Sequence, residues 1–91
     1  MKKTIEVFVF GHVQGVWFRD SAKKKAIEYG IRGYAKNMAD GSVKVLAQHE
    51  DQEKMNLFLE WLKRGPDTAQ VDRLNKKEIA SEEFIDFQVR Y

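Results

Sequence analysis

The hydrophobic residues of this chain follow two spacings, and the order in which these alternate limits the possible folds more than any other feature. In residues 4–10, β-branched and aromatic side chains dominate, and Ile5, Val7 and Val9 share one face, as is typical of a strand. Similar patterns recur, with a hairpin turn at Asp40–Gly41. The predicted strands cover residues 4–10, 31–37, 42–47, 71–79 and 85–91.

Two stretches have helical spacing instead. The first ends at Gly30, which is a common residue just after a helix. The second has Asp51 as its expected cap and Gly65–Pro66 as its terminator. The apolar positions are Phe18, Ala22, Ala26 and Tyr29 in the first helix and Met55, Phe58, Leu59 and Leu62 in the second.

The predicted elements follow the order βαββαβ, with one strand added at the C-terminus. Helices in this order pack on one face of a mostly antiparallel sheet, so the sequence predicts an α+β fold, the ferredoxin-like sandwich. We expect one domain over residues 1–91, closed by a half-buried last strand. The apolar residues of that strand, expected on its buried face, are Ile85, Phe87, Val89 and Tyr91.

The composition excludes several kinds of site. The chain has no cysteine, which rules out disulfides, thiolate metal sites and cysteine nucleophiles. It has no apolar run of membrane-spanning length and no signal-peptide pattern, so we expect a soluble cytoplasmic protein without a membrane partner. The net charge is only +2, and Lys23–Lys25 fans around a helix, so no nucleic-acid partner is expected. The composition does not exclude a small anionic substrate.

The segment FGHVQGVWFRD, residues 10–20, joins the first strand to the first helix. Gly11 and Gly15 let its backbone take positive φ angles and approach a ligand closely. Successive amides from about Val13 onward then converge at a helix start, where the dipole favours an anion. Glycines before a helix would fit a plain turn equally well. Arg19, however, opposes the dipole unless an anion binds there, so the segment predicts a phosphate-sized site.

The predicted topology brings a second polar residue to this loop. A right-handed crossover makes the first two strands parallel, with the third strand between them, so both strands end at the same edge of the sheet. The glycine loop leaves the first strand there, and Asn37 ends the second. The two backbones are then about 10 Å apart. Arg19 and Asn37, 18 residues apart in sequence, are therefore candidates for one site.

Four blocks of the sequence resemble the acylphosphatase family, in its order and spacing across essentially the whole chain. The blocks are GHVQGVWFR, GYAKNMADGSVKV, KRGPDTAQVDR and FQVRY. The resemblance implies an enzyme that hydrolyses acyl phosphates to a carboxylate and inorganic phosphate. It implies that Arg19 binds the phosphate and that Asn37 positions the attacking water. The family's phosphate loop matches the backbone of Val13, Gln14, Gly15, Val16, Trp17 and Phe18.

The mechanism implied by the resemblance needs no metal, no cofactor and no covalent phosphoenzyme. Asn37 is no base near neutral pH, but its carbonyl can accept a hydrogen bond from water while its amide donates one. On this route the proton passes to the substrate's own phosphate, and Arg19 with the loop amides stabilises the equatorial oxygens. We expect a small acyl phosphate as partner, inorganic phosphate as product, and a monomer.

Two other functions remain open from the sequence. A non-catalytic anion-sensing module would keep the loop without turnover. An RNA-binding domain of the RRM type shares the fold, but it needs exposed aromatics on its first and third strands, and residues 43–48 have none. Next to the loop, His12 is expected to be an exposed strand-end residue instead of a base. Trp17 is expected to pack against or cover the loop, with shaping of the site entrance as the alternative.

Overall fold

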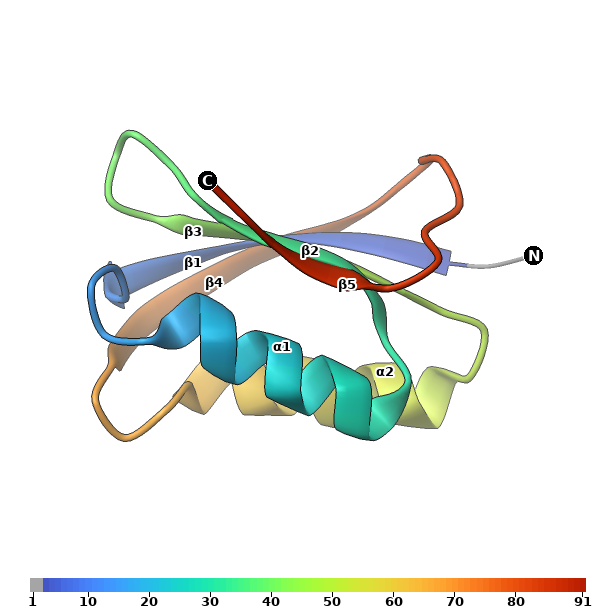
Figure 1. The fold of residues 1–91 in the computed structure, drawn as a ribbon, viewed down its shortest axis with the longest axis horizontal. Coiled ribbons are helices and arrows are strands. Elements are labelled where there is room, and N and C mark those ends of the chain that lie inside the picture. Colours follow the sequence, from blue (N-terminus) through green and yellow to red (C-terminus); the bar gives the residue numbers. More distant parts are fainter. Residues whose placement is uncertain (1–2) are drawn as a thin grey trace.

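The computed structural model describes residues 3–91. A five-stranded sheet carries both helices on one face, so the predicted ferredoxin-like α+β fold is confirmed (Figure 1). Among the described residues, no helix is both long and apolar enough to cross a membrane. The elements in chain order are β1 (Lys3–His12), α1 (Phe18–Tyr29), β2 (Arg32–Asn37), β3 (Val43–His49), α2 (Gln52–Arg64), β4 (Gln70–Ile79) and β5 (Phe87–Arg90).

The strand order across the sheet is β4-β1-β3-β2-β5. As predicted, β3 lies antiparallel between β1 and β2. Val43, the first residue of β3, pairs with Val9 on one side and with Asn37 on the other. β5 runs parallel to β2 at one edge. The ends of β1 and β2 therefore lie at the same edge of the sheet, where the loop into α1 also begins.

The main core lies between the sheet and the two helices. Val7 and Val9 of β1 are fully buried there against the apolar faces of α1 and α2. The expected helix signals are present: Asp51 accepts hydrogen bonds from the amides of Glu53 and Lys54 at 2.9 and 3.3 Å. The helix residues of this core are Phe18, Ala22, Ala26, Met55, Phe58, Leu59 and Leu62.

The C-terminal strand is shorter than predicted. Ile85 and Tyr91 were expected on its buried face, but each is 91% exposed, so that prediction is wrong for both. Strand pairing with β2 begins only at Phe87. Just before it, the Gln48 side chain accepts a hydrogen bond from the Phe84 amide at 2.9 Å. Phe84 is buried against Tyr34 and Leu46, whereas Ile85 is exposed to solvent.

Candidate active site

The loop between β1 and α1 turns at two residues with positive φ. Gly15 has φ 76°, and Trp17, which precedes α1 as its N-cap residue, has φ 64°. A left-handed conformation costs a non-glycine residue about 1–2 kcal/mol, so the surrounding structure must hold Trp17 in place. Within the described chain, no side chain caps α1. The amides of its first turn are thus left for a ligand.

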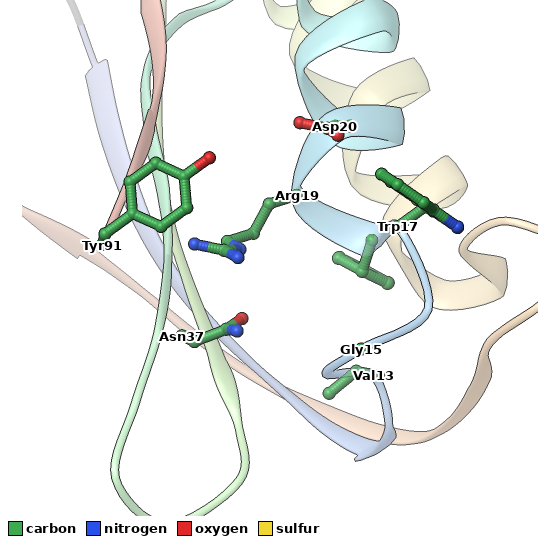
Figure 2. A pocket seen from close by; sticks show the side chains of 8 residues that line it. Val13, Gly15, Trp17, Arg19, Asp20, Asn37 and Tyr91 are labelled. Carbon is green, nitrogen blue, oxygen red and sulfur yellow. The ribbon is translucent and has the colours of Figure 1, made fainter.

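A pocket of about 240 Å³ opens at this loop. As the topology predicted, Arg19 and Asn37 reach it from different elements, and Figure 2 shows both side chains pointing into it. Tyr91, the C-terminal residue, lines another side of the pocket. This pocket is smaller than the pockets that bind drug-sized ligands. Its volume suits a small anion with a short attached group. Its lining residues are Val13, Gly15, Trp17, Phe18, Arg19, Asp20, Asn37 and Tyr91.

The last two residues of the chain hold the Arg19 guanidinium. Its Nη1 donates a hydrogen bond to the Arg90 carbonyl at 2.8 Å. The guanidinium carbon lies 4.5 Å from the centre of the Tyr91 ring, a cation–π distance. The other donors of the planar fork stay available for an oxyanion. The sequence did not reveal this contact, because it depends on β5 lying next to β2.

The Asn37 side chain carries an unused acceptor. Its Oδ1 is buried and has no hydrogen-bond partner within residues 3–91. The backbone of Asn37 is fixed by pairing with Val43, so the side chain has a defined origin at the end of β2. Buried amide oxygens are nearly always paired, to protein groups or to water. Because Asn37 lines the pocket, this oxygen is a candidate acceptor for a hydrogen-bond donor bound there.

Two of the six predicted loop residues do not line the pocket. The Gln14 side chain instead donates hydrogen bonds to the carbonyls of Met38 and Ser42, at 2.8 and 2.9 Å. Val16 is buried in the core, and its carbonyl accepts a hydrogen bond from the Thr68 hydroxyl at 2.6 Å. These contacts hold the loop from two sides.

Three residues in or next to the pocket had roles predicted from the sequence. Gly11 belongs to β1 at a bulge opposite β4, and a Cβ there would lie 2.2 Å from the Gln70 carbonyl oxygen. Gly11 has the predicted positive φ, 134°, but it is not among the residues that line the pocket, and its close approach is to β4. Trp17 is 72% exposed and lines the pocket, which contradicts tight packing against the loop and agrees with a place at the site entrance. His12 is exposed at the end of β1, as predicted.

Two acidic residues shape the surroundings of the site. Asp20 lies in the first turn of α1, where a carboxylate is favoured by the helix dipole. Figure 2 shows it and Asn37 at opposite ends of the pocket. Asp40 accepts hydrogen bonds from the hydroxyl and the amide of Ser42, at 2.6 and 3.0 Å. These bonds lower the pKa of the Asp40 carboxyl. Asp40 thereby orders the turn that follows Asn37.

The family model described as acylphosphatase matches residues 5–89 of the chain. The chain belongs to the acylphosphatase family. An acylphosphatase of Methylococcus capsulatus is 43% identical over 88 residues, which cover 96% of this chain and 95% of that protein. Membership in this family makes the chain an enzyme, a hydrolase of acid anhydrides.

Solved acylphosphatase structures agree with the fold. The acylphosphatase from Coxiella burnetii superposes with a TM-score of 0.91 at 40% identity, covering 98% of this chain and 93% of that one. The acylphosphatase from Bacillus subtilis gives a TM-score of 0.90 at 30% identity, with all of both chains covered. The family resemblance carried by the four sequence blocks is therefore confirmed.

Proposed function

We propose that the chain hydrolyses the carboxyl–phosphate bond of small acyl phosphates, with the phosphate held by Arg19 and by loop amides. The observation that carries this proposal is the convergence of Arg19 and Asn37 on one pocket beside an uncapped helix start. The guanidinium fork and the free amides match the oxygens of a phosphate group. The acyl group then extends toward the open side of the pocket.

Asn37 orients the attacking water in this proposal. Its buried, unpaired Oδ1 accepts a hydrogen bond from the water, and its amide group can donate to a second oxygen. An asparagine does not take up the proton, so the proton passes to a phosphate oxygen of the substrate. Water attacks phosphorus, the bond from phosphorus to the carboxyl oxygen breaks, and carboxylate and inorganic phosphate leave. No metal and no covalent phosphoenzyme take part.

Arg19 and the loop amides stabilise the charge on the phosphoryl group during this step. Phosphoryl transfer depends chiefly on positioning and on electrostatic stabilisation of the equatorial oxygens. The contacts to Arg90 and Tyr91 fix the guanidinium before substrate arrives. Removing one well-placed donor of this kind costs about 10²–10³ in kcat in other enzymes.

Hydrolysis of benzoyl phosphate in ¹⁸O-labelled water tests the proposal. The wild-type protein should release benzoate and inorganic phosphate, with the label in the phosphate. Arg19→Gln should lose turnover and show weaker inhibition by inorganic phosphate. Arg73→Gln is the matched control. It removes the same charge, but Arg73 stacks on Phe10, away from the pocket. Label in the benzoate, or equal losses in the two variants, would contradict the proposal.

The non-catalytic anion-binding module left open by the sequence would need only the loop and Arg19, and membership in the acylphosphatase family argues against it. That module would bind inorganic phosphate and release no benzoate above the uncatalysed rate. The buried free acceptor on Asn37 favours the hydrolase, since anion binding calls for donors and not for an acceptor.

A further inference from the structure

The anion-binding loop and the turn that follows Asn37 approach each other without strand pairing. Pairing between β1 and β3 ends at Val9 and Val43. Beyond that point, β1 continues to His12 paired with β4 alone. In the described chain, no backbone hydrogen bond joins the loop of residues 13–17 to the turn of residues 38–42. Backbone pairing places Asn37 beside Val43 and Val43 beside Val9, and beyond that point side chains provide the direct contacts between the loop and the turn.

The Gln14 side chain spans this gap. Both of its amide hydrogens are used, one on the Met38 carbonyl at 2.8 Å and one on the Ser42 carbonyl at 2.9 Å. The same two residues close the turn, because the Met38 amide donates to the Ser42 carbonyl at 2.9 Å. Met38 directly follows Asn37 in the chain. A shift of this turn would therefore move the Asn37 side chain relative to the loop.

We propose that Gln14 is a positioning residue for the reaction: its primary amide sets the distance between the anion-binding loop and Asn37. This inference rests on the roles given above to the loop and to Asn37. A group with two N–H donors is needed at this position, because both partners are carbonyl oxygens. Glutamate offers acceptors, and methionine has similar length without a donor. The loop keeps its second attachment, from Thr68 to Val16, whatever occupies position 14.

Loss of the Gln14 contacts and loss of the Thr68 contact should have different kinetic effects. Gln14→Met should lower kcat for benzoyl phosphate by about 10- to 100-fold, because a misplacement of about 1 Å can cost 10²-fold in rate. The inhibition constant of inorganic phosphate should change by no more than about threefold, since the loop and Arg19 stay together. Thr68→Val, a nearly isosteric control, loosens the loop itself. It should weaken inhibition by phosphate and lower kcat less than Gln14→Met does.

Gln14→Glu gives a second readout that a loss of packing would not produce. At neutral pH its carboxylate faces two carbonyl oxygens and cannot donate, whereas the protonated acid can donate one hydrogen bond. The ratio of its kcat to the wild-type kcat should therefore rise as the pH falls from about 7 to about 5. The hydrogen bonds from Ser42 lower the pKa of Asp40 in the same turn, which favours its ionised form. Gln14→Met should show no such rise.

Measuring Asn37→Ala beside these variants separates the two proposals. If Asn37→Ala is inactive while Gln14→Met keeps the wild-type kcat, the role given to Gln14 is wrong and the proposed function stands. Equal loss of kcat in Gln14→Met and Thr68→Val, or a pH-independent ratio for Gln14→Glu, would also overturn the inference. If Asn37→Ala keeps the wild-type kcat, the role of Asn37 is wrong and the inference about Gln14 falls with it.

Discussion

At the scale of single residues, Gly11 near the end of β1 and Gly15 within the loop have different roles. Gly11→Ala would place a Cβ against the backbone of β4, so we expect a loss of about 3 kcal/mol or more in the free energy of unfolding. Gly15 has open space around it, so Gly15→Ala should cost only about 1 kcal/mol, from its φ of 76°. Urea unfolding of both variants measures this. Similar losses would contradict the assignment.

Tyr91 contributes to the site through the face of its ring. Tyr91→Leu removes the cation–π contact to Arg19, which is worth about 0.5–1 kcal/mol at an exposed site. The inhibition constant of inorganic phosphate should therefore rise about two- to fivefold. Tyr91→Phe keeps the ring and should behave as wild type in the same inhibition assay. A loss of equal size in Tyr91→Phe would show that the hydroxyl matters and the ring face does not.

At the scale of elements, the turn between β2 and β3 is ordered by Asp40. The hydrogen bonds from Ser42 favour the charged carboxylate and lower its pKa below 3.8, the usual value. Because the folded-state pKa is the lower one, this contribution to stability is present above pH 3.8 and is lost as the pH falls through the folded-state value. An NMR titration of the Asp40 carboxyl should give a midpoint below 3.8.

Ser42→Ala is the control for this titration. It removes the hydroxyl donor, which is the largest cause of the shift, so the midpoint of Asp40 should move back toward 3.8. A midpoint at or above 3.8 in the wild-type protein would show that the turn is not held by these bonds.

Elements whose burial follows local spacing could be predicted from the sequence. In α2 the four apolar residues, the Asp51 cap and the Gly65 end all lie where their spacing placed them. The C-terminal strand shows the limit of this reasoning. Ile85 fits the alternating pattern as well as Phe87 does, yet strand pairing and the contact between Gln48 and Phe84 decide which of them is buried. Both contacts join distant parts of the chain, so spacing cannot show them.

At the scale of the whole molecule, the proximity of Arg19 and Asn37 could be predicted from the sequence. The handedness of the crossover places the ends of β1 and β2 at the same edge of the sheet. The contacts that hold these side chains were not predictable in the same way. The contact of Arg19 with Arg90 and Tyr91 requires knowing that β5 pairs with β2. The two bonds of Gln14 require the path of a loop with two left-handed residues.

In the proposed reaction, Arg19 and the loop bind phosphate, and Asn37 positions water. The most direct test measures, for folded Asn37→Ala, both the dissociation constant of inorganic phosphate by calorimetry and kcat for benzoyl phosphate. We expect kcat to fall by about 10²-fold or more, with the dissociation constant within about threefold of wild type. Full turnover by folded Asn37→Ala, or loss of phosphate binding equal to the loss of turnover, would contradict these roles.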